Sequence, residues 1–272
     1  MPRITHTTDF SPASHSAFRH ALALAVAARA ALDIVHVGST DGDADWASFP
    51  RVRPTLAAWG RISLSAGTAD VEPATGVLVT NVEIARNDAL AGLTRYFQKH
   101  RPDVIVAATH AREGIDRVLH GSLTEDLMQR TRVPALLIGP SAASVIDEAT
   151  GALLVNDILL LLAESPPPET MIDLMEDALA PLGLGASRLH TLTVGCDLPD
   201  LLDRHGRRWP VTRRDGPVVE TIVAEARFTG AGLIAMPTAG RHGIMDAMRG
   251  STTSQVLAAA PVPVFAVPVT AD

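Results

Sequence analysis

The chain has 272 residues, more than one compact core needs and enough for two. With 47% hydrophobic and 19% charged residues it has the balance of a soluble globular protein, and no apolar run approaches the ~20 residues that span a bilayer. The formal net charge of −7 at pH 7 opposes contact with a phosphate backbone, which argues against general nucleic-acid binding.

The first half of the chain reads as strands that alternate with helices. Short apolar runs without polar alternation indicate strands buried on both faces, as in parallel sheets. Ser11 and Pro12 form a typical helix start, with a serine cap and a proline in the first turn. The strands expected in this half comprise residues 4–8, 32–37, 77–82, 104–108 and 135–138.

Two segments interrupt this pattern. Residues 38–60 carry Trp46, Phe49 and Trp59, and we interpret them as a surface insertion that packs its own aromatic side chains, with a lid over a site as the alternative. Residues 140–152 are rich in small residues and lack a period. They predict a boundary between a first domain, residues 1–145, and a second domain, residues 152–272.

The second half repeats the same order of elements. Ser165 and Pro166 again suggest a helix start, and Met171, Met175 and Leu179 lie at the spacing of one helix face. The third strand has the weakest pattern. The strands expected here comprise residues 158–163, 189–194, 209–212, 233–236 and 264–267.

An internal repeat relates the two halves at an offset of 129 residues. The matched residues are Thr109 with Thr238, Arg112 with Arg241, Gly121-Ser122 with Gly250-Ser251, and Val133-Pro134 with Val262-Pro263. Such agreement without a gap indicates two copies of one supersecondary unit.

The loop after the fourth strand of each half has the chemistry of an anion site. Such a loop leaves the carboxyl end of a central parallel strand, where open α/β sheets bind ligands. Gly121-Ser122 and Gly250-Ser251 would place free N–H groups at a helix start, which suits phosphate. The alternative is a plain capping box, Ser122 with Glu125 and Thr252 with Gln255.

Further motifs flank these loops. The first loop is preceded by Asp103-Val104-Ile105-Val106 and followed by Val133-Pro134-Ala135-Leu136-Leu137. A further motif near the start of the chain is Thr8-Asp9-Phe10-Ser11-Pro12. In this combination the chain resembles the universal stress protein family in its tandem form. The resemblance implies two Rossmann-like α/β domains of the adenine-nucleotide α-hydrolase type, each a five-stranded parallel sheet with helices on both faces. It also implies that the last strands of the two domains pair within one chain as a pseudo-dimer, while a homodimer of whole chains stays open.

The resemblance also implies ATP or another adenine nucleotide as ligand, with Mg²⁺ as an open companion. In the first domain the implied nucleotide-binding residues are Asp9 and Val37 at the adenine and Thr109, His110, Arg112, Gly121 and Ser122 at the ribose and phosphates. In the second domain they are Thr238, Gly240, Arg241, Gly250, Ser251 and Thr252.

Each half departs from the family pattern. Ala108 and Ala111 replace both loop glycines of the first half, and Pro237 replaces the first loop glycine of the second and removes an amide donor. Aligning the two helix starts puts Ala163 where Asp9 stands, so the second half lacks the acid unless Glu164 substitutes. The first half should therefore hold the better base pocket and the second half the better phosphate loop.

Other residue types favour no further site. Among ten histidines no two are three or four apart, so we expect no metal site, and we expect His15 and His20 to be solvated. Arg204, Arg207, Arg208, Arg213 and Arg214 are interpreted as a solvated loop. The single cysteine, Cys196, is interpreted as a structural thiol; it and the polar N-terminus suggest a cytoplasmic protein.

No nucleophile elbow or Walker loop is found, and we expect no catalytic residues. We therefore expect a regulatory protein of the stress response that binds an adenine nucleotide in at least one domain. Two alternatives stay open: a pseudo-dimeric interaction protein that binds no nucleotide, and a slow ATPase.

Overall fold

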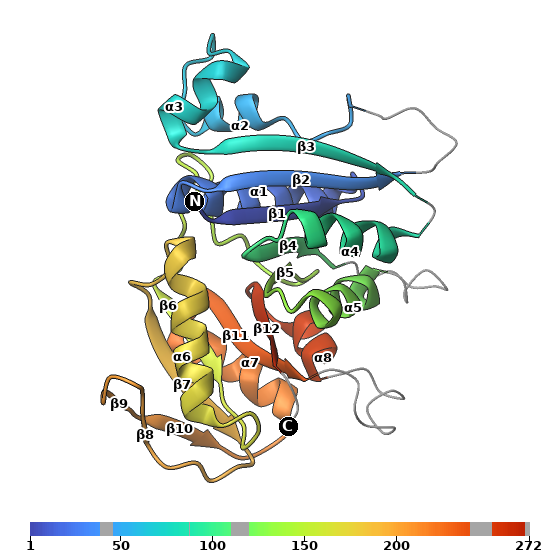
Figure 1. The fold of residues 1–272 in the computed structure, drawn as a ribbon. Helices are drawn as coiled ribbons and strands as arrows, with labels where there is room; N and C mark the ends of the chain where they lie inside the picture. Colours follow the sequence, from blue (N-terminus) through green and yellow to red (C-terminus); the bar gives the residue numbers. More distant parts are fainter. Residues whose placement is uncertain (39–45, 87, 110–119, 240–251, 270–272) are drawn as a thin grey trace.

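The structure, a computed structural model, describes residues 1–38, 46–86, 88–109, 120–239 and 252–269. Its centre is one ten-stranded sheet in the order β10-β7-β6-β11-β12-β5-β4-β1-β2-β3 (Figure 1). The strands of the first half are β1 (Arg3–Thr8), β2 (Ala31–Gly38), β3 (Leu78–Ala85), β4 (Val104–Ala108) and β5 (Ala135–Ile138). Those of the second half are β6 (Asp157–Leu161), β7 (Arg188–Val194), β10 (Val211–Arg214), β11 (Leu233–Ala239) and β12 (Val264–Val269).

Each half contributes five parallel strands, and the halves meet where β5 and β12 pair in antiparallel register. Leu136 lies opposite Phe265 at this junction, and both are almost fully buried. The pairing removes two apolar strand edges that would otherwise invite association. The expected α/β fold and the expected pairing of the last strands are both confirmed.

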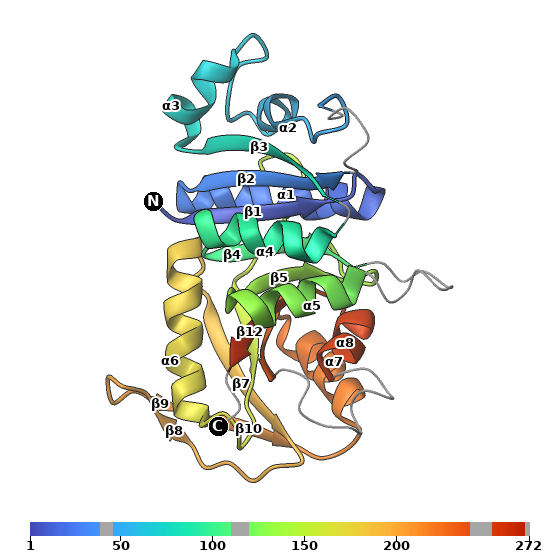
Figure 2. The ribbon, with the colours of Figure 1, turned by 45° about the vertical axis from the view of Figure 1, so that its right-hand side comes forward.

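Helices cover both faces of the sheet. They are α1 (Pro12–Ala28), α2 (Val52–Ala58), α3 (Val71–Thr75), α4 (Ala89–Lys99), α5 (His120–Thr131), α6 (Pro168–Leu179), α7 (Val218–Thr229) and α8 (Thr252–Ala259), with short 3-10 turns at Thr68–Asp70 and Ala180–Leu182. One buried cluster joins α1 and α6 to the sheet, and a second joins α4, α5, α7 and α8 to its other face. In Figure 2, α1 lies behind the strands and α4 and α5 lie in front of them.

The central strands β4 and β5 are apolar on both faces, as the uninterrupted runs predict. Ile105 and Leu137 belong to the cluster on the α5 side, whereas their neighbours Val106 and Leu136 belong to the cluster on the α1 side. This period of two is the consequence of strand geometry, and it explains why no polar alternation marks these segments.

The two halves begin their first helices differently. The Ser11 side chain accepts a hydrogen bond from Ser14 N and caps α1, as predicted. In the second half the predicted start at Ser165-Pro166 is wrong, because α6 begins at Pro168 and no side chain caps it. Pro167 and Pro168 follow Pro166, and a residue that precedes a proline is disfavoured from the helical region, so the helix begins only at the last of the three prolines.

The third strand of the second half is also corrected. The segment predicted over residues 209–212 divides at Pro210: Trp209 belongs to β9 (Arg208–Trp209), which pairs with β8 (Leu201–Leu202) in a separate ribbon. Only β10 pairs with β7 in the main sheet. Proline cannot donate to a ladder, which is the physical reason for the break.

The aromatic rings of the insertion in the first half pack on one another, as predicted, and they also pack against the main core. Trp46 stacks on Phe49 with ring centroids 5.3 Å apart, and Phe49 also meets Phe10 edge-on at 5.3 Å. Phe49 and Trp59 are each 4% exposed and join the main core cluster. The described part of the insertion is therefore anchored to the first helix and strand.

Candidate functional site

A cavity of about 110 Å³ opens in the first half between the carboxyl ends of β1, β2 and β4. The chain runs from β1 outward to β2 and β3 and then returns to β4 on the other side of β1, so β1 and β4 flank the topological switch point. Doubly wound sheets bind their ligands at this place. The lining residues are Thr7, Thr8, Asp9, Ser14, Val35, His36, Val37, Ala89, Leu93, Ala107, Ala108, Leu123 and Thr124.

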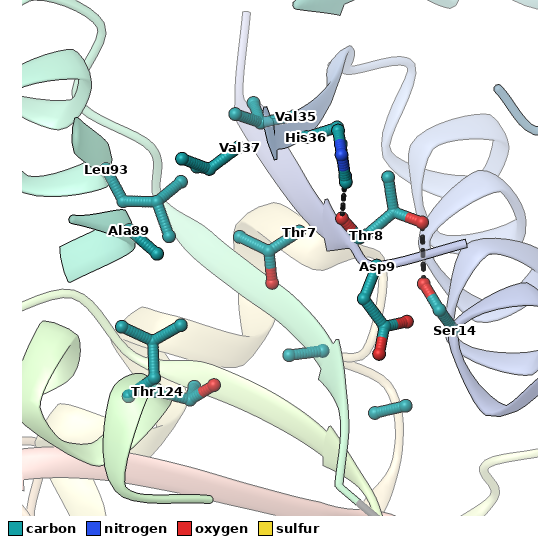
Figure 3. A pocket seen from close by; sticks show the side chains of 13 residues that line it. Thr7, Thr8, Asp9, Ser14, Val35, His36, Val37, Ala89, Leu93 and Thr124 are labelled. Atoms are coloured by element: carbon teal, nitrogen blue, oxygen red, sulfur yellow. Dashed lines mark hydrogen bonds between the residues drawn. The ribbon is translucent and has the colours of Figure 1, made fainter. Parts of the chain in front are cut away.

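The cavity has an apolar side and a polar side. Figure 3 shows Val37 and Leu93 near each other on one side and the Asp9 carboxylate on the other. Asp9 follows β1 directly and is exposed, and its Oδ1 accepts a hydrogen bond from Ser11 N at 3.0 Å. An apolar wall beside an exposed carboxylate suits a flat heterocycle that carries a hydrogen-bond donor.

A buried hydrogen-bond chain supports the polar side from below. The Ser14 hydroxyl donates to Thr8 Oγ1 at 2.7 Å and lies 3.4 Å from His6 Nε2. His6 Nδ1 lies 3.0 Å from Val106 O and donates to it. Burial lowers the pKa of His6 to about 4, against the opposing hydrogen bond from its ring to Val106. The ring is therefore neutral near pH 7, and with the proton on Nδ1 its Nε2 presents a lone pair to the Ser14 hydroxyl, whose own proton goes to Thr8.

His36 forms the rim of the same cavity. Its Nδ1 lies 2.8 Å from Thr8 O and donates to it (Figure 3). Its ring also stacks on Phe10 with centroids 4.1 Å apart. Phe10 has a φ of 61°, a left-handed conformation that is uncommon for an aromatic residue. The turn that Phe10 makes therefore joins the rim to the anchored aromatic insertion.

The predicted residues of the first domain fall into three groups. Asp9 and Val37 line the cavity. Thr109 follows β4, is buried, and lies with its hydroxyl 3.5 Å from Ile138 O, while Gly121 and Ser122 belong to the first turn of α5, which begins two residues before Ser122. His110 and Arg112 lie outside the described residues.

Several lining residues were not predicted. Thr7, Ser14, Leu93 and Thr124 come from four different elements, β1, α1, α4 and α5, and only the packing of the helices on the sheet brings them together. The repeat carried one usable signal, because Thr124 matches Thr253 at the same offset as the Gly-Ser steps.

The second half has a cavity of about 280 Å³ in the equivalent place. Strand register proves the equivalence: Ile4 pairs with Val104 in the first half as Ile158 pairs with Leu233 in the second. The lining residues are Leu161, Leu162, Ala163, Ser165, Pro166, Leu192, Val194, Cys196, Val218, Ile222, Met236, Pro237, Thr252, Thr253 and Val269. Asp9 and Ala163 follow the equivalent residues Ile4 and Ile158 at the same distance along the chain, so Ala163 occupies in the second half the position that Asp9 occupies in the first, as the sequence alignment predicts.

The predicted residues of the second domain are only partly described. Thr252 begins α8 and lines the second cavity. Thr238 is buried near the end of β11, and its hydroxyl has no hydrogen-bond partner in the described part of the structure. Gly240, Arg241, Gly250 and Ser251 lie outside the described residues.

The histidine prediction needs one correction. His15 is exposed, but His20 is 1% exposed and therefore not solvated. Its Nδ1 lies 2.8 Å from Ser16 O, and its Nε2 accepts from Val145 N at 3.4 Å, so the ring ties α1 to the segment between the halves. Burial lowers the pKa of His20. Within the described ranges, no group of three or more His, Cys, Asp or Glu side chains is placed to hold a metal ion.

The arginine cluster is solvated, but its charge is compensated. The ion pairs are Arg204 with Asp177, Arg207 with Asp203 and Glu176, Arg208 with Asp200, Arg213 with Asp197, and Arg214 with Glu225. Arg208 belongs to β9, and Arg213 and Arg214 belong to β10, so the loop interpretation was wrong for these three. Burial raises the pKa of the Asp203 carboxyl, but hydrogen bonds from Trp209, Arg207 and His205 outweigh it and hold the pKa far below its usual range.

Comparisons with known proteins agree with this architecture. The profile of the universal stress protein family matches the chain twice, at residues 1–139 and 157–268. A search of curated proteins finds no match. None of the helices in the described ranges combines the length and apolar character that crossing a bilayer requires.

Solved structures of similar fold cover almost the whole chain. A universal stress protein from Archaeoglobus fulgidus superposes with a TM-score of 0.63 at 17% identity, covering 98% of this chain and 96% of its own. A putative universal stress protein from Pseudomonas aeruginosa gives 0.61 at 13% identity, with 98% and 93% covered. A functionally unknown protein from Pseudomonas aeruginosa gives 0.59 at 12% identity, with 98% and 92% covered. At such identities the likeness establishes the fold.

Proposed function

Because the chain belongs to the universal stress protein family, we propose that its first half binds ATP or another adenine nucleotide in the cavity beside Asp9. The bound state would act as a signal by altering an interaction surface of the protein. The observation that carries this proposal is the pairing of an exposed carboxylate with apolar walls at the switch point of the first half.

The chemistry of adenine fits these walls. Val37 and Leu93 offer apolar surface to the ring, and the Asp9 carboxylate can accept a hydrogen bond from the exocyclic amino group. The first turn of α5, with Gly121 and Ser122, starts on the same edge of the sheet, and its N–H groups suit the phosphates. Mg²⁺ would enter as the companion of a triphosphate.

The second half supports the choice of the first. The equivalent cavity has Ala163 where the first has Asp9, and Leu161 and Leu162 where the first has Thr7 and Thr8. An adenine amino group placed there would lose its acceptor, and a buried donor without a partner costs about 1–3 kcal/mol. We therefore assign one nucleotide to each chain.

Asp9→Asn tests the assignment directly. Asparagine keeps an oxygen acceptor for Ser11 N but replaces the second oxygen with an NH₂ donor, which repels the adenine amino group. Isothermal titration calorimetry should show ATP affinity falling about tenfold or more, the effect of losing one hydrogen bond to a charged acceptor. Titrations with and without Mg²⁺ determine whether the ion contributes.

Glu164→Gln is the matched control, since Glu164 adjoins the position that corresponds to Asp9. It should leave ATP affinity unchanged. If Glu164→Gln weakens binding and Asp9→Asn does not, the site lies in the second half and the assignment is wrong. If the wild-type chain binds no adenine nucleotide at all, the protein acts as an interaction module, and the proposal fails.

A further inference from the structure

The cavity of the second half differs from that of the first half in the side chains that line it. None of the fifteen described residues that line it has an ionisable carboxylate, imidazole, amine or guanidinium group. Among these described residues the polar side chains are those of Ser165, Thr252, Thr253 and Cys196, and the others are aliphatic, methionine or proline. This cavity is also larger than the first, at about 280 Å³ against about 110 Å³.

The contrast follows strand register and so reflects residue choice rather than a different fold. At the carboxyl end of the first strand, Thr7, Thr8 and Asp9 are replaced by Leu161, Leu162 and Ala163. On the opposite wall the match continues, because Leu93 of α4 and Ile222 of α7 lie at equivalent places of the repeat. Among the described residues, the fold thus presents one version of the pocket lined by a carboxylate and an imidazole and another lined by neither.

We propose that the second cavity binds a compact, uncharged and mainly apolar small molecule. An apolar cavity of about 150 Å³ accepts benzene, so one of about 280 Å³ suits a molecule of roughly a dozen heavy atoms. An ionised ligand that enters the cavity would lose its hydrating water and would meet no charged side chain among the described lining residues, which is costly. The inference is independent of nucleotide binding in the first half.

Cys196 gives a reporter at the site itself. It is the only cysteine of the chain, is half-buried, and lines the second cavity. A bound molecule should therefore shield the thiol from N-ethylmaleimide, whose addition is followed by mass spectrometry. The probe is 1-naphthol, an uncharged molecule of two fused rings. At four times its dissociation constant it should slow the alkylation about fivefold, whereas ATP at saturation should not slow it.

Two variants locate the effect. Ala163→Asp places a carboxylate on the wall, and because 1-naphthol must strip water from that charge, its affinity should fall about tenfold or more. Asp9→Asn, the matched change in the first cavity, should leave the protection of Cys196 intact. A thermal melt shows whether Ala163→Asp folds.

A second measurement needs no substitution. Wild-type protein alkylated at Cys196 with the bulkier N-benzylmaleimide should no longer bind 1-naphthol, as judged by naphthol fluorescence. The proposal is overturned if 1-naphthol fails to protect Cys196, if it binds equally after alkylation, or if ATP protects the thiol as well as 1-naphthol does. In the last case the second cavity is a nucleotide site.

Discussion

Acidification should weaken the fold through His6. Burial lowers the pKa of His6 from 6.5 to about 4 in the folded protein, while the unfolded chain keeps the ordinary value. Below the unfolded pKa the unfolded state therefore binds a proton that the native state refuses, and stability falls as the pH falls. The full difference of about 2.5 pKa units corresponds to about 3 kcal/mol, reached below the folded pKa.

The useful window lies above the titration of ordinary carboxylates. Between about pH 7.5 and about pH 5, the two pKa values of His6 give a loss of about 2 kcal/mol in the free energy of unfolding. His20 acts in the same direction, because burial lowers its pKa as well. Comparing wild type with His6→Gln isolates the His6 contribution, since an uncharged amide can still donate to Val106 O.

Urea unfolding followed by tryptophan fluorescence at both pH values provides the measurement. His6→Gln should have a pH dependence smaller than that of wild type by about 2 kcal/mol. Ser16→Ala is the control, because Ser16 is exposed on α1 and its side chain carries no titrating group, and it should retain the wild-type dependence. Equal dependence in wild type and His6→Gln would refute the reasoning, whatever the absolute stability of the variant.

Two glycine substitutions test the packing between segments, each by urea unfolding. A Cβ on Gly139 would lie 2.3 Å from the backbone oxygen of Leu257 across the junction of the halves, so Gly139→Ala should cost about 1–3 kcal/mol; no loss would contradict this contact. A Cβ on Gly151, where φ is +67°, would lie 2.3 Å from the Trp59 ring, whereas Gly206 has a φ of +75° and open space around it. Gly206→Ala should therefore cost only the left-handed backbone penalty of about 1–2 kcal/mol and Gly151→Ala clearly more; equal costs would argue against the Trp59 contact.

The fold could be predicted because its signals are local and repeated. Apolar runs such as residues 104–108 and 233–236 mark buried strands, and the offset of 129 shows that one unit occurs twice. The failures are also local. The prolines that follow Ser165 displaced a helix start because a residue before a proline is disfavoured from the helical region, and Pro210 split a strand because it lacks the N–H that a ladder needs.

The candidate site could be predicted only in part. Asp9 stands next to a recognisable turn, so its position at a strand end follows from sequence. Leu93 and Thr124 reach the same cavity from helices, and their proximity depends on how far each helix is shifted along the sheet. The burial of His20 was missed for the same reason, because the segment around Val145 that covers it comes from 125 positions along the chain.

The polar character of one cavity and the apolar character of the other emerged only when strand register was known. Asp9 and Ala163 could be matched by their distance from the following Ser-Pro pairs, but Leu161 and Leu162 became lining residues only through the pairing of β6 with β11. A register is a long-range property, and a shift of one residue would turn each side chain to the other face.

The number of nucleotides bound per chain tests the central claim most directly. Calorimetric titration of the wild-type protein with ATP should give one equivalent, and Asp9→Asn should weaken that single binding event. Two equivalents per chain, or one that Asp9→Asn leaves unchanged, would contradict the division of the molecule into a polar nucleotide site and an apolar second site.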